Sequence, residues 1–407
     1  MDSPRRGKWV RRRLVLRILL TGALVLDGTG RAYEKYEVGI DGEEIVNVGP
    51  AHSGSRGFDR VIDTAGKTVM PGMVDTHVHF GGGDFDPAGA QVPVGLQTIR
   101  SLEAAQRSLL AGCTTVRSAG AQFHLDVDVR DAITQGIAWG PRIVASGRGI
   151  THTGGHASEL AIEADGQVEI TRAVRALVGR GVDSIKLFGV SAGVATAGAD
   201  VGAEGFSVEE IRAAIQECRR FGKLDQVHSI GLSATKNAIA AGVSSIDHGH
   251  FLDEEVCTKM KADGIVLVPT FGPTYYYTVR REAEPWRIAR AEAVRDAHVA
   301  SFRLALELGV SIAMGSDLGF ASRMKNGENA LELTEMVEHG MKPEDAIVAA
   351  TGTAARLLRR DDVLGTLKVG KMADVIVVDG NPAEDIKCLE TSVEVVMKGG
   401  VIYRGDS

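Results

Sequence analysis

Two kinds of hydrophobic pattern divide this chain of 407 residues. Near both ends, short apolar runs are separated by glycine-containing turns, without an amphipathic stretch long enough for a helix. Examples are ILLTGALVLDG and YEVGIDGEEIVNVG near the start and GTLKVGKMADVIVVDG near the end. Apolar runs of this length between turn residues predict β-strands. We therefore predict a composite β-sandwich domain that combines residues 14–68 with residues 362–407.

Between these ends, strand-length apolar runs alternate with long helical patterns such as LQTIRSLEAAQRSLLAG. This alternation is typical of repeated βα units and a parallel sheet. The candidate strands are VMPGMVDTHVHF, CTTVRSAG, RIVASG, DSIKLF, LDQVHS, SSIDHGH, IVLVPT and SIAMGSD. Eight such units in about 290 residues fit a (β/α)₈ TIM barrel, so we predict an α/β protein with its barrel over residues 69–361.

Composition narrows the class of protein. Hydrophobic residues make up 44% of the chain and charged residues 24%, which is typical of globular proteins and argues against disorder or many membrane spans. The net charge of -7 offers no overall basic field for nucleic acid, so we expect neither a nucleic-acid nor a membrane partner. The four cysteines lie far apart without a CxxC pair, which favours a cytoplasmic protein over a disulfide framework.

The start of the chain is basic. PRRGKWVRRR followed by LVLRILLTGALVL has the charge and hydropathy pattern of a secretory signal. Against a signal, Arg17 interrupts the apolar run, no A-x-A site follows it, and the sequence continues into strand-like residues. We interpret residues 1–13 as a disordered basic extension, or as the product of an upstream start codon.

Chemically reactive side chains fall near the C-terminal ends of the predicted strands. They are His77 and His79 in the first strand, Lys186 in the fourth, His228 in the fifth, His248 in the sixth and Asp317 in the eighth. In a barrel these strand ends meet at one mouth, where the catalytic groups of this fold are found. The pattern predicts a single active site at that mouth.

The spacing of His77 and His79 suits a metal ion, because residues two apart in a strand point the same way. Imidazole nitrogen is a common ligand of zinc and similar divalent ions. Lys186 lies inside the apolar run DSIKLFGV, where a lysine must be paired or have a changed charge state. Asp317 ends an apolar run, and a helix N-cap is the alternative interpretation.

The ordered motifs PGMVDTHVH, IKLF, VHS, IDHGH and GSD resemble those of the amidohydrolase superfamily over nearly the whole chain. TGGHA, DSIKLF and AGVSSIDHGHFLD are most similar to its imidazolonepropionase-like branch. That branch includes Xaa-Pro, Xaa-Arg and Xaa-Lys dipeptidases, phenylurea and molinate hydrolases and ochratoxin-degrading amidases. The flanking TAGKTVMPG resembles the family's crossing from β-sandwich to barrel.

The resemblance implies a centre of two divalent ions, which we expect to be zinc. Its ligands would be His77, His79 and Asp317 for the more buried ion, His228 and His248 for the other, and Lys186 between them. Carbon dioxide would convert the Lys186 amine to a bridging carbamate. A hydroxide bridging the ions would attack the carbonyl, and Asp317 would act as general base and then as general acid.

Several further histidines are candidates for contact with substrate. His156 in TGGHA, together with His152, resembles the substrate-contacting loop of the branch, and the His156 imidazole could polarise the carbonyl oxygen. The alternative is that both are solvated loop residues. His250 projects to the same face as His248, and we interpret it as supporting a ligand rather than binding metal.

An insert after the seventh strand, PTFGPTYYYTVRREAEPWRIAR, is rich in aromatic residues. It supplies a mix of side chains suited to covering an aromatic or amphipathic substrate: Tyr275, Tyr276, Tyr277, Arg280 and Trp286. Tyr275, Tyr276 and Arg280 are our candidates for binding it. A contact between subunits is an equally open interpretation of this segment, and we expect a homo-oligomer.

The predicted function is hydrolysis of an amide-type C–N bond in a small molecule: a peptide, an N-acyl amino acid, an aryl urea or a carbamate. Many dipeptidases of the branch carry a tyrosine just after the fifth-strand histidine, but here Ser229 and Ile230 follow, which puts a dipeptide in doubt. The nearest alternative is a cyclic-amide hydrolase of the imidazolonepropionase type. From another class, an inactive binding or scaffold homologue is disfavoured by the complete ligand set. A deaminase is disfavoured by Lys186.

Overall fold

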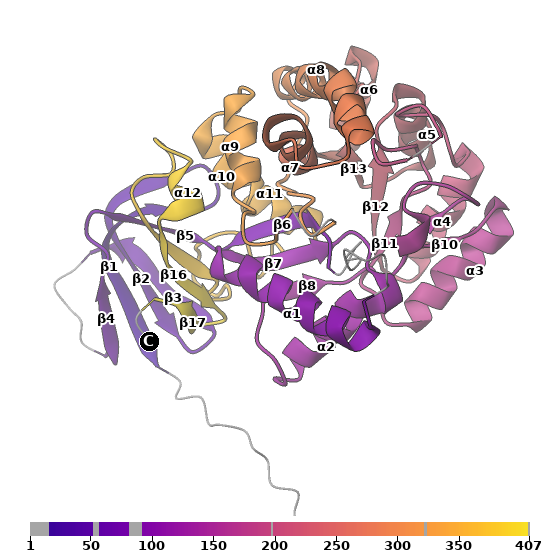
Figure 1. Ribbon diagram of the computed structural model, residues 1–407. Helices are drawn as coiled ribbons and strands as arrows, with labels where there is room; N and C mark the ends of the chain where they lie inside the picture. The colour runs from indigo at the N-terminus through magenta and orange to yellow at the C-terminus, as the bar shows by residue number, and fades with distance from the viewer. Residues whose placement is uncertain (1–15, 52–56, 81–91, 197, 321–323, 406–407) are drawn as a thin grey trace, which may run out of the picture.

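The computed structural model describes residues 16–51, 57–80, 92–196, 198–320 and 324–405. The chain forms an all-β region beside a larger region of parallel strands and helices (Figure 1). The extension predicted for residues 1–13 lies outside the described residues. Within these ranges, no helix combines the length and the apolar character that crossing a membrane requires.

Both ends of the chain contribute to the all-β region. Among the described residues, its sheet has eight strands: β1 (Arg17–Leu26), β2 (Ala32–Asp41), β3 (Glu44–Pro50), β4 (Arg60–Asp63), β5 (Lys67–Pro71), β15 (Val375–Asp379), β16 (Val393–Lys398) and β17 (Val401–Arg404). Antiparallel pairing of β5 with β15 joins the two ends. Buried residues from both ends of the chain, Val25 in β1, Val69 in β5 and Val375 in β15, belong to one apolar cluster. The composite all-β region is thus confirmed, whereas the boundaries at 68/69 and 361/362 stay a prediction.

Parallel strands form the wall of the second region. They are β6 (Met73–Val78), β7 (Cys113–Ser118), β8 (Arg142–Val144), β11 (Ser184–Leu187), β12 (Leu224–Ser229), β13 (Ser245–His248) and β14 (Val266–Val268). The ladders run β6-β7-β8 and β11-β12-β13-β14. Two strands that were not predicted, β9 (Gly149–Thr151) and β10 (Ala161–Glu163), extend the second ladder beyond β11.

The predicted eighth strand is less regular than expected. Its segment makes isolated parallel bridges, Leu267 with Ile312 on the β14 side and Val78 with Leu318 on the β6 side. Between β8 and β11, the amide of Ser184 donates to the carbonyl of Ala145. The segment therefore occupies the eighth position of the barrel, although its residues do not form a continuous ladder.

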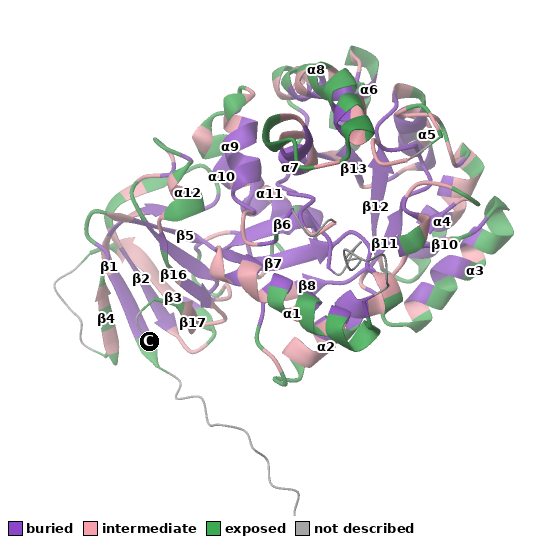
Figure 2. Ribbon diagram, in the orientation of Figure 1, coloured by how far each residue is buried: buried purple, intermediate pink, exposed green. Residues whose placement is uncertain are grey.

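Helices cover the outside of these strands. They are α1 (Val94–Leu110), α2 (Leu125–Thr134), α3 (Gly166–Gly179), α4 (Val208–Arg220), α5 (Leu232–Ala241), α6 (Glu254–Asp263), α8 (Pro285–Leu308), α9 (Leu331–Glu338), α10 (Pro343–Ala349) and α11 (Gly352–Leu357). Figure 2 shows buried strands inside and exposed outer helix faces. Every residue of β6, β7, β11, β12 and β13 is buried, as expected for parallel strands covered by helices. Burial on both faces removes the regular alternation of apolar and polar residues along these strands, and their polar side chains are buried together with the apolar ones.

Candidate active site

A cavity lies at the C-terminal ends of the barrel strands. Its lining includes the predicted metal ligands His77, His79, Lys186, His228, His248 and Asp317. Residues such as Phe188, Val294 and Phe320 make much of the remaining wall apolar. The structure therefore brings together side chains that are up to 240 residues apart in sequence, as Asp317 is from His77.

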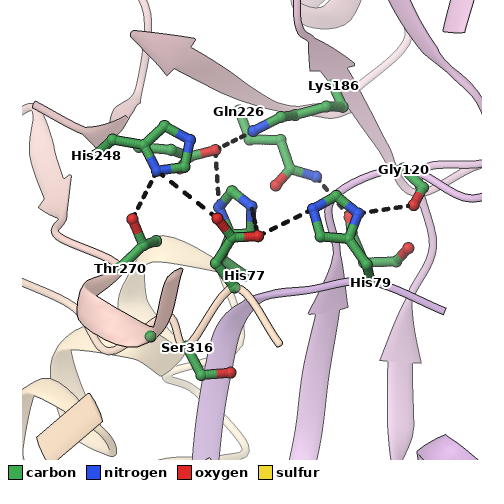
Figure 3. Close-up of polar contacts among 12 residues, drawn as sticks. His77, His79, Gly120, Lys186, Gln226, His248, Thr270 and Ser316 are labelled. Atoms are coloured by element: carbon green, nitrogen blue, oxygen red, sulfur yellow. Dashed lines mark hydrogen bonds and ion pairs between the residues drawn. The ribbon is translucent and has the colours of Figure 1, made fainter. Parts of the chain in front are cut away.

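The tightest cluster of potential ligands is formed by His77, His79 and Asp317. Their ligand atoms lie within 4.8 Å of one another. The Nε2 atoms of His77 and His79 are 3.3 and 3.1 Å from the same oxygen, Oδ1 of Asp317 (Figure 3). His77 lies in β6 and His79 directly follows its last residue, so a spacing of two residues places both imidazoles on one face. These three side chains could hold one divalent ion.

Asp317 reaches this position because its segment approaches β6 very closely. Its amide donates to the carbonyl of His77 at 2.7 Å, and the amide of His79 donates to Leu318 at 2.8 Å. A Cβ atom on Gly319 would lie 2.0 Å from the carbonyl oxygen of His79, so this position requires glycine. Asp317 itself has a φ of +54°, a conformation that costs roughly 1–3 kcal/mol and persists only where its surroundings enforce it.

The other face of the cavity carries His228 and His248. The Nδ1 atom of His248 contacts the hydroxyl of Thr270 at 2.6 Å, and Nδ1 of His79 contacts the carbonyl of Gly120 at 3.1 Å. These contacts fix the rings and leave Nε2 available for the cavity. Nε2 of His228 is buried and has no hydrogen-bond partner among the described residues. Because buried polar atoms are normally paired, this nitrogen fits a metal ligand.

Lys186 has a buried partner that the sequence analysis missed. Its Nζ lies 2.5 Å from Oδ2 of Asp247, and both side chains are fully buried. The same oxygen is 3.1 Å from Nδ1 of His77, and Arg117 lies beyond it, 3.8 Å from Oδ1. Burial lowers the pKa of Lys186, although the attraction of Asp247 opposes this shift. Asp247 could have been suspected, because a carboxylate in the buried run SSIDHGH needs a partner as much as the lysine does.

Burial also controls the charge of the cavity histidines. It lowers the pKa of His156 to about 3, and it holds the pKa values of His228 and His248 well below the usual range. The imidazoles are therefore neutral near pH 7, the form that binds metal. For Asp317, burial alone would raise the pKa, but His77 and His79 hold it well below the usual range.

Of the two loop histidines predicted to contact substrate, His156 lines the cavity and His152 does not line its described part. His156 lines the cavity and stacks on His228 with ring centroids 4.2 Å apart. Its Nδ1 is 2.8 Å from the hydroxyl of Thr196, which accepts a hydrogen bond from the amide of Gly193. His152 is not among the described cavity-lining residues and has its ring edge against Phe206.

The aromatic insert forms α7 (Phe271–Tyr275), a π-helical turn η3 (Tyr276–Arg280) and the start of α8. The hydroxyl of Tyr276 donates to Glu328, and Arg280 forms an ion pair with the same carboxylate, both at 2.8 Å. Among the described residues, Tyr275, Tyr276 and Arg280 do not line the cavity, whereas Tyr277 does. Tyr277 belongs to the aromatic group predicted to cover the substrate, but it was not one of the three residues predicted to bind it.

His250 lines the cavity with its ring stacked on that of His298, at 3.9 Å between centroids. Nε2 of His298 contacts the carbonyl of Pro269 at 2.8 Å, and this contact fixes the orientation of the His298 ring. Burial lowers the pKa of His250 to about 3. This ring pair gives the wall a neutral polar group beside the proposed ligand His248.

Comparison with known proteins agrees with this arrangement. The model of the amidohydrolase family matches residues 68–403. Ochratoxinase from Aspergillus niger is 32% identical over 375 residues, covering 83% of this chain and 76% of the relative. Imidazolonepropionase from Symbiobacterium thermophilum is 26% identical, covering 82% of this chain and 81% of its own. A solved Xaa-Pro dipeptidase with bound methionine covers 96% of this chain and 100% of its own, with 34% identity and a TM-score of 0.89. The chain therefore belongs to the amidohydrolase family.

Proposed function

We propose that this protein is a metal-dependent hydrolase that cleaves an amide-type C–N bond in a small molecule. The observation that carries the proposal is the gathering of four histidines, a lysine and an aspartate in one cavity at the barrel mouth. Relatives with the names ochratoxinase and Xaa-Pro dipeptidase support a hydrolase. Peptides, N-acyl amino acids, aryl ureas and carbamates are the substrate classes we propose.

The donor set fits two divalent ions, which we expect to be zinc. His77, His79 and Asp317 would hold one ion, and His228 and His248 would hold the other. Neutral imidazoles beside a low-pKa carboxylate are the ligands that such ions prefer. When bound, the ions would activate water and polarise the scissile carbonyl.

Lys186 is the proposed site of carboxylation. Burial favours its neutral amine, which forms an N–C bond with carbon dioxide and releases one proton. The resulting carbamate is an anion suited to lie between two cations. Asp247 would then lose the lysine as a cationic partner, but Arg117 and His77 remain beside it.

Two residues of this chain would handle protons and charge at the substrate. Asp317 would take a proton from the attacking water and deliver it to the leaving nitrogen. His156 is neutral, and a hydrogen from the Thr196 hydroxyl to Nδ1 would place its own N–H on Nε2, facing the cavity. A neutral donor there could stabilise charge on the carbonyl oxygen.

The cavity also bears on substrate choice. Ile230, two residues after His228, lines the wall, and it offers no hydrogen bond to a carboxylate. This position supports substrates in which an apolar group lies near the scissile bond, such as anilides or N-acyl derivatives of large amino acids. A dipeptide with a free carboxylate is less well accommodated by this side chain.

The test is a substrate panel with the metal-replete enzyme. It should contain dipeptides, N-acyl amino acids, anilides, aryl carbamates and a cyclic amide, with product formation followed by mass spectrometry. We expect cleavage of an open-chain amide or carbamate, abolished by chelation and restored by zinc. Cleavage of the cyclic amide alone would favour the imidazolonepropionase-type alternative. No turnover together with no bound metal would favour an inactive homologue.

A further inference from the structure

Asp75 lies in β6, two residues before His77, and its side chain is fully buried. Among the described residues, four hydrogen bonds reach its carboxylate. Oδ1 accepts from the amides of His77 at 3.1 Å and Ser316 at 3.0 Å. Oδ2 accepts from the Ser316 hydroxyl at 2.6 Å and from Nδ2 of Asn329 at 2.8 Å. Burial raises the pKa of Asp75, whereas these four donors favour its ionised form.

These hydrogen bonds act on the residue that precedes Asp317. Ser316 is tied to Asp75 through both its amide and its hydroxyl. Asp317 follows at once in the left-handed conformation, and its own amide is held by the carbonyl of His77. A strained residue keeps its conformation only when its neighbours fix it from more than one side. Asp75 supplies one of those constraints from the strand that carries the proposed ligand His77 and leads directly into His79.

We propose that Asp75 is a positioning residue that fixes Asp317 against His77 and His79 by anchoring Ser316. The part of the proposal that concerns hydrolysis rests on the function proposed above. The anchoring itself concerns the protein alone and can be measured without metal or substrate.

A carboxylate is required at this position for a chemical reason. Asparagine has nearly the same volume but offers a single accepting oxygen, and its amide nitrogen is a donor. In Asp75→Asn, that nitrogen must face either two backbone amides or the donors of Ser316 and Asn329. In the first orientation the nitrogen opposes both backbone amides, so the Ser316 amide loses its acceptor. In the second, the Ser316 hydroxyl can turn to accept, but Nδ2 of Asn329 faces another donor. Both orientations weaken the anchoring of the Ser316 segment.

The chain contains a matched control away from the cavity. Asp225 in β12 is 4% exposed and accepts from Ser244 in the same way, from the amide at 2.6 Å and from the hydroxyl at 2.8 Å. Asp225 does not line the described part of the cavity. Asp225→Asn therefore makes the same chemical change and causes a similar local loss of hydrogen bonds, without touching the Asp317 segment.

The decisive experiment is hydrogen exchange by mass spectrometry on the metal-free protein. In Asp75→Asn, exchange across residues 311–320 should accelerate by about tenfold or more relative to wild type. In Asp225→Asn the same segment should stay within about threefold. If Asp75→Asn exchanges no faster in this segment than Asp225→Asn does, the anchoring is wrong.

A second pair of variants, Ser316→Ala and its control Ser244→Ala, makes a milder change, because each removes one hydroxyl. This pair tests the anchoring if Asp75→Asn does not fold. Exchange of the 311–320 segment should rise at least about threefold in Ser316→Ala and not in Ser244→Ala. Equal exchange in the two serine variants would likewise overturn the anchoring.

Kinetics on the zinc-loaded enzymes then test the link to catalysis. We expect kcat to fall by about tenfold or more in Asp75→Asn, with KM within about threefold and no such fall in Asp225→Asn. Faster exchange with unchanged kcat would overturn the catalytic part of the proposal. A wild type that hydrolyses nothing would refute the proposed function, while the exchange result would still decide the anchoring.

Discussion

Acidifying the metal-free protein from about pH 6.5 to about pH 5.5 should destabilise it strongly, because buried histidines around the cavity are neutral when folded. Around the cavity, burial lowers the pKa values of five described histidines. The pKa is lowered to about 3 in His156 and His250 and well below the usual range in His228, His248 and His298. In the unfolded chain a histidine titrates near pH 6.5. Their contribution to stability is therefore complete well above that pH and is lost as the pH falls below it.

The expected loss can be worked out by linkage. Between about pH 6.5 and 5.5, each histidine with such a shift lowers the free energy of unfolding by about 1 kcal/mol. Glu332 acts in the opposite sense, because burial raises its pKa well above the usual value and the folded state keeps a proton that the unfolded state releases. It offsets roughly one histidine. The raised pKa values of His77 and Asp75 act in the same sense as Glu332. The net loss is therefore at most about 4 kcal/mol, against the roughly 5–15 kcal/mol that stabilises a typical domain.

The assay is urea unfolding of chelator-treated protein at about pH 7.5, 6.5 and 5.5. His250→Phe is the informative variant, because phenylalanine can keep the stack on His298 but cannot take up a proton. It should reduce the loss by about 1 kcal/mol relative to wild type. A wild-type loss below about 1 kcal/mol, or the same pH dependence in both proteins, would refute the assignment of the acid sensitivity to these rings.

Other predictions concern the metal site. Lys186→Ala should bind the second zinc ion poorly and lose nearly all turnover, yet recover part of it with a short added carboxylic acid; full turnover without the acid would exclude the carbamate. Asp317→Asn should retain much of its zinc by elemental analysis but lose about 10²–10⁴-fold in kcat, and activity within about threefold of wild type would remove it from the mechanism. Gly319→Ala should lose zinc and activity, because its Cβ would lie 2.0 Å from the His79 carbonyl oxygen, so a wild-type zinc content would contradict the close approach.

The barrel could be predicted from sequence because short strand-length segments alternate with long helical patterns along the chain. The eighth segment was predicted as a strand from the apolar pattern of SIAMGSD. In the structure this segment pairs with β14 and with β6 through isolated bridges instead of a continuous ladder. Its last residue, Asp317, has a left-handed φ instead of an extended one. A hydropathy pattern cannot reveal this change, because the contacts of Ser316 and Asp317 with Asp75 and His77 are made across to another strand.

For the site, the proposed ligands were found because strand ends and a spacing of two residues are visible in the sequence. Partners such as Asp247, which lies 61 residues from Lys186, depend on which strands become neighbours. The aromatic insert shows a different limit of prediction from sequence. Tyr275, Tyr276 and Tyr277 are consecutive, so each points in a different direction around a helix, and the π-helical turn alters that direction further. Sequence alone therefore did not identify Tyr277 as the one that lines the cavity.

The pairing of β5 with β15 also has a consequence during synthesis on the ribosome. Residues 67–71 must wait for residues 375–379, about 300 residues later, before that side of β5 acquires its partner. At roughly 5–20 residues per second, the wait lasts about 15 to 60 seconds, while the barrel between them is translated. During that time the edge of β5 is open to strands from other nascent chains. Chains truncated before residue 375 should keep this edge open permanently and aggregate, even where the barrel sequence is complete.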